Sequence, residues 1–157
     1  MKKSNPLPAM PSLWNEDERA AIVARVNRLT PQQQRAWGKM ETSRVLAHLA
    51  DSLRMALGDI PTKQQGGLMS TALMRYLIIH KLPWPKGKAQ APPEAFTTSP
   101  LTWEEDRAAL LHLIERFATA RGKPLAAHSA LFGPMKPRDW DVLMCRHLDH
   151  HLTQFGV

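Results

Sequence analysis

The chain has 157 residues, of which 43% are apolar and 22% are charged. This length predicts a single domain over 1–157, and the composition is that of a globular protein rather than a disordered chain. Lysine and arginine exceed aspartate and glutamate by 21 to 14, a net charge of +7. The basic residues are dispersed and no nucleic-acid motif accompanies them, so nucleic acid is not the expected partner.

Other composition features exclude a membrane span and a disulfide. No stretch reaches the ~20 apolar residues that a spanning helix needs. The N-terminus has no apolar segment of the kind found in secretory signals, so we expect a cytoplasmic protein. Cys145 is the single cysteine, which excludes an internal disulfide and a cysteine-only metal site. We expect it to be a small buried apolar residue.

The first third of the chain predicts an extended arm followed by two long helices. Residues 1–13 are rich in proline and predict the extended N-terminal arm. Asn15 is a good N-cap for a helix that ends at Pro31, and Thr30–Gln33 resembles the start of a second, short helix. Thr42 or Ser43 should cap the next long helix, which Gly58 ends.

The middle of the chain predicts one apolar helix and one long connection. Residues 68–80 are apolar nearly all round, which predicts a buried or groove-lying helix. Residues 83–100 contain five prolines, so we expect an extended excursion over the surface. Within it, Trp84 lies between two prolines and is a candidate to pin the excursion or to line a pocket.

Two more long helices are predicted in the C-terminal half. Thr102 and Glu105 form a capping box that begins the first of them. After a loop over 122–136, Pro137 or Asp139 begins the last helix, and Gly156 ends it. Strand signals are nearly absent. The chain therefore predicts an all-α fold, a four-helix bundle with an additional short helix and long surface connections.

Histidines concentrate in the last predicted helix. His147 and His151 are spaced i and i+4, which places both rings on one helix face, one turn apart. Two imidazoles so placed can bind one divalent ion, with a third ligand from another helix. His48 is the best candidate, because Val45, His48 and Ser52 form a stripe that should point toward the core. Spacing alone leaves a hydrogen-bonded polar core equally open.

The neighbours of this pair have less specific interpretations. Gln154 shares the helix face of His151, and it could orient a ligand or substrate or simply close the end of the bundle. His150 should face elsewhere, because it lies about 100° around the helix from His151. Asp149 should point away from the same ion. His128 lies in the loop before the helix, where an exposed position is expected.

Several segments resemble the DinB/YfiT-like superfamily of metal-dependent enzymes. They are Val45–Leu49 (VLAHL), Leu131–Pro134 (LFGP), His147–Gly156 (HLDHHLTQFG), and an excursion like Trp84–Lys88 (WPKGK). The resemblance covers about Thr42 to Val157 and is strongest at the C-terminal end. It implies a four-helix bundle, a homodimer, and a metal site made by one histidine of the second long helix and an HxxxH pair of the last.

The resemblance maps the metal ligands onto His48, His147 and His151. It implies one divalent ion, nickel or zinc foremost, and a metal-dependent hydrolase or a thiol S-transferase acting on an unknown small molecule. A thiol cofactor would fit the second activity. The alternative is a non-catalytic helical binding or stress-response protein, whose histidine cluster is structural or vestigial.

Overall fold

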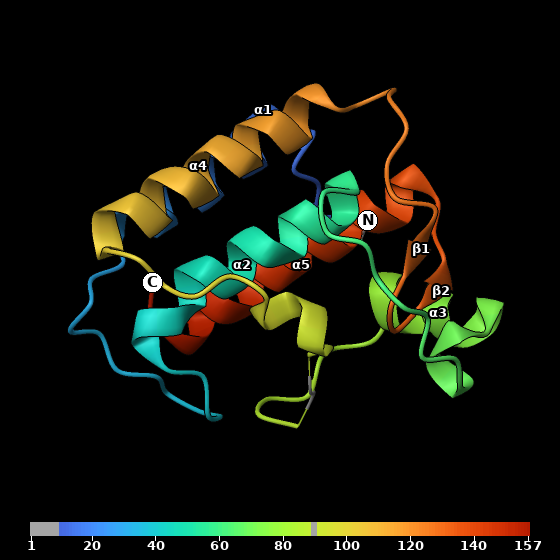
Figure 1. Cartoon of the computed structure of the whole chain (residues 1–157), viewed down its shortest axis with the longest axis horizontal. Coiled ribbons are helices and arrows are strands. Elements are labelled where there is room, and N and C mark those ends of the chain that lie inside the picture. The colour runs from blue at the N-terminus through green and yellow to red at the C-terminus, as the bar shows by residue number, and fades with distance from the viewer. Residues whose placement is uncertain (1–9, 89–90) are drawn as a thin grey trace, which may run out of the picture.

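Four long helices form a bundle in the computed structural model, which describes residues 10–88 and 91–157. They are α1 (Glu16–Arg28), α2 (Thr42–Leu57), α4 (Trp103–Thr119) and α5 (Pro137–Gln154). A shorter helix, α3 (Ala72–His80), lies beside one end of the bundle (Figure 1). The predicted all-α fold is confirmed for the described residues. Residues 1–9 of the predicted arm lie outside them.

The bundle has two layers. Helices α1 and α4 lie together in one layer, and α2 and α5 lie together in the other (Figure 1). Contacts run from α1 to α4 and α5, and from α2 to the same two helices. The apolar stripes of the four helices face the space between the layers, where Phe117, Phe155 and Leu53 are fully buried. This packing places α2 directly against α5.

Helix ends follow the local signals at several positions. Asn15 accepts a hydrogen bond from the amide of Glu18, Thr102 and Glu105 form the predicted capping box, and Gly58 ends α2 with a φ of 84°. Two expectations are wrong. Glu41 rather than Thr42 or Ser43 is the N-cap of α2, because the hydroxyl of Thr42 donates to the carbonyl of Gln33 instead. The expected short helix at Thr30–Gln33 is a turn.

The described end of the predicted arm packs against α5. Leu13 is fully buried, and Asp141 of α5 accepts hydrogen bonds from the hydroxyl of Ser12 and the amides of Leu13 and Trp14. A buried carboxylate needs such donors, because an unpaired one would be costly to desolvate. Asp141 therefore fixes where the chain enters α1.

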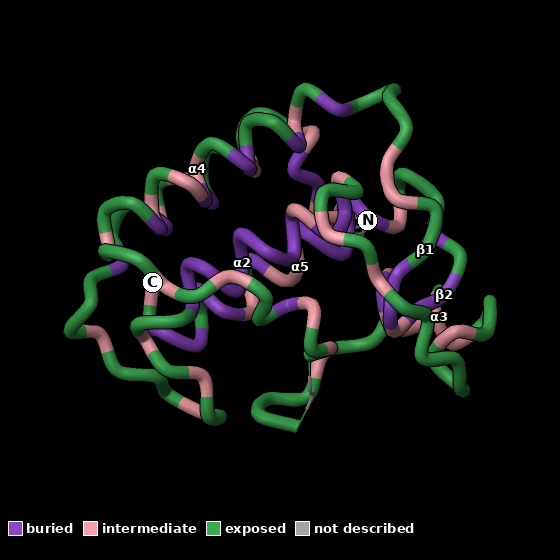
Figure 2. Tube along the Cα trace, viewed as in Figure 1, coloured by how far each residue is buried: buried purple, intermediate pink, exposed green. Residues whose placement is uncertain are grey.

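A helix forms over part of 68–80, but the expectation that it is buried or lies in a groove is wrong for most of its side chains. The segment forms a short 3-10 turn, η1 (Leu68–Ser70), followed by α3. Leu68 and Leu73 are 70% and 67% exposed, and Ile79 is the fully buried residue of α3. Figure 2 shows α3 largely exposed or half-buried. The main contacts of the helix with other described elements are with α5 and η1, and one contact face cannot cover a helix that is apolar on all sides.

The long connections carry three small elements. The excursion over 83–100 contains the 3-10 turn η2 (Pro93–Phe96), which packs against α2. The loop before α5 contains a hairpin of β1 (His128–Ser129) and β2 (Gly133–Pro134), in which Ser129 pairs with Gly133. Among the described residues, no helix is both long and apolar enough to cross a membrane.

Candidate metal centre

Three imidazole rings converge where α2 crosses α5. His48 comes from the middle of α2, and His147 and His151 come from successive turns of α5. The ring centroids lie 5.0 Å apart for His48 and His147, 4.9 Å for His48 and His151, and 4.8 Å for the α5 pair. One nitrogen from each ring lies within 4.8 Å of the others, an arrangement that could hold a metal ion.

The excursion fixes the ring of His48 on the side of Nδ1, opposite the nitrogen that faces His147. Its Nδ1 lies 3.0 Å from the carbonyl oxygen of Ala95 in η2. A carbonyl can only accept, so this contact assigns the proton of His48 to Nδ1 and leaves a lone pair on Nε2. Asp51, fully buried one turn further along α2, holds η2 in place by accepting hydrogen bonds from the amide and hydroxyl of Thr98.

The ring of His151 is fixed by a chain of two hydrogen bonds. The side-chain nitrogen of Gln154 donates to the carbonyl of Trp37 at 2.8 Å, which orients the Gln154 amide. The amide oxygen then faces Nδ1 of His151, also at 2.8 Å. Because this oxygen can only accept, His151 carries its proton on Nδ1 and keeps a lone pair on Nε2. Gln154 thus contacts a candidate ligand, on the side away from the cluster.

His147 completes the group. Its Nε2 lies 3.1 Å from Nε2 of His48. Two nitrogens bound at ~2.0–2.1 Å to one tetrahedral zinc ion would lie about 3.3 Å apart, so the spacing fits a shared ion. A hydrogen bond from His147 to the lone pair of His48 would give a similar distance. The donor set, three imidazole nitrogens, suits zinc and nickel.

The surroundings of the cluster favour neutral rings. Burial lowers the pKa of His48, against the opposing effects of Ala95 and Asp51. Burial also lowers the pKa of His147 well below its usual value, and the rings of His151 and His48 lower it further. Burial and the ring of His48 lower the pKa of His151 to about 3. Neutral imidazole is the form that binds a metal ion.

Two aromatic side chains of the excursion stand beside the cluster. Phe96 stacks on His48, with ring centroids 4.9 Å apart and planes inclined by 21°. The ring centroid of Trp84 lies 6.5 Å from that of His147 and 5.9 Å from that of His150. Trp84 shows both roles expected for it, because it lines a neighbouring pocket and its indole N–H donates to the carbonyl of Ile78, which pins the start of the excursion to α3. Trp84 near the start of the excursion and Phe96 near its end therefore both lie beside the histidine cluster.

The structure separates the other candidate residues from the three-histidine group. The ring of His150 lies edge-on to His151 at 5.3 Å and faces a neighbouring pocket. Asp149 points away from the three-histidine group, and its Oδ1 forms an ion pair with Nη1 of Arg25 at 2.6 Å. Cys145 is buried, and burial raises the pKa of its thiol to about 12. His128 is exposed, as expected, but lies in β1.

Sequence patterns did not indicate Trp37, Ala95 or Phe96. Trp37 and Ala95 act through backbone carbonyls, which every residue possesses, so their identity carries no signal. Phe96 lies in a proline-rich connection without periodicity, and no pattern could place it over His48.

The packed helices and the three converging imidazoles place this protein among helical-bundle proteins with a candidate metal site. The chain belongs to a family of proteins of unknown function, DUF1569, whose family model matches residues 12–156. No curated protein and no solved structure shows a significant match to it.

Proposed function

We propose that this DUF1569 protein is a DinB/YfiT-like metalloprotein that binds one divalent ion, zinc or nickel, through His48, His147 and His151. The observation that carries the proposal is the convergence of the three rings, with one nitrogen of each within 4.8 Å of the others. Backbone and amide oxygens face Nδ1 of His48 and of His151, which leaves the Nε2 lone pair of each ring for a metal ion, and Nε2 of His48 faces His147. DUF1569 is commonly grouped with DinB/YfiT-like proteins, which agrees with the motifs of the sequence.

The proposed chemistry is that of a metal-dependent hydrolase or thiol S-transferase acting on a small molecule. His48, His147 and His151 would hold the ion, and an ion with only three protein ligands would supply the chemistry of lowering the pKa of a bound water or thiol. The chain itself holds the ligand geometry through Ala95 and Gln154. Phe96 and Trp84 place apolar surface beside His48 and His147. The homodimer, the thiol cofactor and the cytoplasmic location stay predictions.

Metal analysis tests this proposal. The protein is purified without added metal, and its metal content is measured by mass spectrometry before and after loading with zinc or nickel. We expect about one ion per chain, and none in a His147→Ala/His151→Ala variant. His112→Ala is the matched control, because His112 is an exposed histidine of α4.

Negligible metal in both the native protein and the double variant, after loading, would overturn the proposal and favour the non-catalytic alternative. A His151→Gln variant guards against misfolding of the double variant, since it removes one ligand at similar volume. Circular dichroism verifies that each variant is folded.

A further inference from the structure

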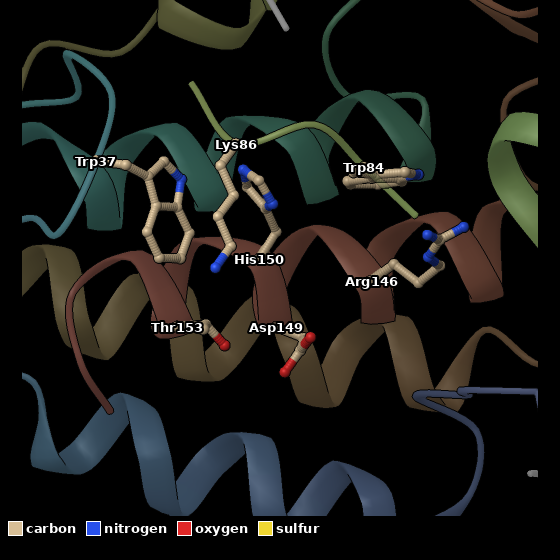
Figure 3. A pocket seen from close by; sticks show the side chains of 7 residues that line it. All are labelled: Trp37, Trp84, Lys86, Arg146, Asp149, His150 and Thr153. Atoms are coloured by element: carbon tan, nitrogen blue, oxygen red, sulfur yellow. The ribbon is translucent and has the colours of Figure 1, made fainter. Parts of the chain in front are cut away.

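A separate small pocket lies next to the histidine cluster. It encloses about 200 Å³ and lies between two indole rings, those of Trp37 and Trp84 (Figure 3). Its floor is a face of α5 that includes His150 and Thr153. This volume suits a ligand, or part of one, no larger than a single ring with a substituent.

The pocket and the histidine cluster share a wall. The ring of His150 lines the pocket and lies 5.3 Å from the ring of His151, edge to face. Trp84 lines the pocket too, and its ring contacts His150 and His147. A molecule in the pocket would therefore lie one side chain away from the proposed ion.

The charge that lines the pocket is positive. The ammonium of Lys86 lies 4.6 Å from the ring centroid of Trp37, and the guanidinium of Arg146 lies 4.7 Å from that of Trp84. Among the residues that line the pocket, Asp149 carries the carboxylate, and this carboxylate forms an ion pair with Arg25. The pocket therefore contains two cations whose charge its own carboxylate does not neutralise.

Arg146 and Lys86 differ in their contacts with the rest of the protein. Arg146 donates to the carbonyls of Ile78, Ile79 and Leu82, and so ties the end of α3 to α5. Lys86 has no carboxylate within ion-pair distance among the described residues. It is an exposed side chain held on an aromatic face, and its three N–H groups are available to a ligand.

The indole of Trp37 adds a second donor. Its Nε1 is buried and has no acceptor among the described residues. Figure 3 shows the edge that carries this nitrogen turned toward Lys86 and His150. A buried N–H without a partner is destabilising, so such a group in a native protein calls for an explanation. An acceptor-rich ligand beside Lys86 would supply the missing partner once the Lys86 side chain shifts from the Trp37 ring to meet it.

We infer that this pocket binds the anionic oxygen group of a small organic molecule, a carboxylate or a phosphate ester, with Lys86 as its charge partner and the indoles of Trp37 and Trp84 enclosing its apolar part. As a statement about the substrate class, this inference rests on the proposed metal centre. As a statement about anion binding, it stands without the ion.

Binding of three matched probes tests the inference. Benzoate and its neutral isostere benzamide differ in charge, and phenyl phosphate distinguishes a phosphate from a carboxylate. Each is titrated into the full-length protein by calorimetry, with and without prior metal removal by a chelator. We expect saturable binding of benzoate or phenyl phosphate in the low millimolar range, and at least about tenfold weaker binding of benzamide.

Two lysine variants locate the binding. Lys86→Met should weaken anion binding by about tenfold or more, because it removes the charge and retains most of the length of the side chain. Lys88→Met is the matched control, since Lys88 is an exposed lysine of the same segment outside the pocket lining. Both variants remove one positive charge, so a difference between them reports a local effect.

Equal affinity of the native protein and Lys86→Met for the anions, equal affinity for benzoate and benzamide, or no saturable binding of either anion would each overturn the inference. Loss of binding on metal removal would overturn it too, because the probe would then be a ligand of the ion. Lys86-dependent binding in a protein that takes up no metal would support the pocket and reject the proposed metal centre.

Discussion

Gly38 and Gln154 approach so closely that a side chain on Gly38 has no room. A Cβ atom there would lie 2.8 Å from Nε2 of Gln154, the nitrogen that donates to Trp37. The backbone of Gly38 also has a φ of 75°, which glycine adopts without cost. The loop after α1 thereby presses against the residue that orients His151.

Gly38→Ala should weaken metal binding. The new methyl group displaces Gln154, and loss of a partner that orients a ligand typically costs 10–100-fold in affinity. Chelator competition with zinc measures the change. Gly122→Ala is the matched control, because its φ of 79° imposes similar backbone strain while a Cβ there meets nothing within 4 Å. Equal zinc affinities of the two variants would contradict the role of Gln154.

Asp51→Asn should weaken both folding and metal binding. Asp51 accepts from Thr98 and from Arg54, so an amide in its place turns a donor toward donors. We expect the free energy of unfolding to fall by about 2–3 kcal/mol. We also expect lower zinc affinity of the folded protein, because η2 no longer holds the carbonyl of Ala95 against His48.

Asp141→Asn separates the two effects of Asp51→Asn. Asp141 is just as buried, and it anchors Ser12 and Leu13 rather than η2. Urea unfolding should show a loss of stability in both variants, whereas the zinc affinity should fall for Asp51→Asn alone. An unchanged zinc affinity in Asp51→Asn would show that η2 does not position His48.

The metal-free protein should lose stability as the pH falls below about 6.5. The pKa of His151 is about 3 in the folded protein, and the other two rings of the cluster also have lowered pKa values. Between the lowered and the usual values, the unfolded chain binds more protons than the folded one, so acid favours unfolding. The contribution of the buried neutral rings to the free energy of unfolding is complete above the usual pKa of histidine. It declines as the pH falls toward the lower pKa of the ring in the folded protein.

For His151 alone, the free energy of unfolding should drop by about 1.4 kcal/mol between pH 7.5 and pH 5.5. Urea titrations of the chelator-treated protein at the two pH values measure the drop. The His147→Ala/His151→Ala variant should show a smaller pH dependence. A steeper dependence in that variant would contradict the assignment to the cluster.

Cys145 should be inert toward thiol reagents in the folded protein. Raising the thiol pKa from 9.0 to about 12 reduces the reactive thiolate at pH 8 by about a thousandfold. Burial also blocks access, since the side chain lies in the core. A chromogenic disulfide reagent should therefore label the protein in denaturant and leave the folded protein unlabelled for hours. Labelling of the native protein within minutes would contradict this placement.

Local and periodic signals predicted much of the fold. A capping interaction involves residues three apart, so Asn15 and Thr102 could be identified without tertiary information. Helical periodicity likewise places His147 and His151 on one face. His48 was predictable because its stripe, with Val45 and Ser52, had to face the interior, and all three are buried.

Features that depend on where loops run were not predictable. The carbonyls of Ala95 and Trp37 orient the rings of His48 and His151, yet both come from segments without regular structure. The exposure of α3 depends on which elements cover it. An apolar segment gives no indication of how many neighbours will cover it, and Leu68 of η1 and Leu73 of α3 are both largely exposed.

The excursion between α3 and α4 reaches the histidines through Trp84 near its start and through Ala95 and Phe96 near its end. The imidazoles themselves come from the two packed helices α2 and α5. Such a division lets evolution exchange the aromatic side chains beside the rings by altering one connection, while the positions of the three histidines stay with the packed helices. Members of the family that share the three histidines are therefore expected to differ from one another first within this connection.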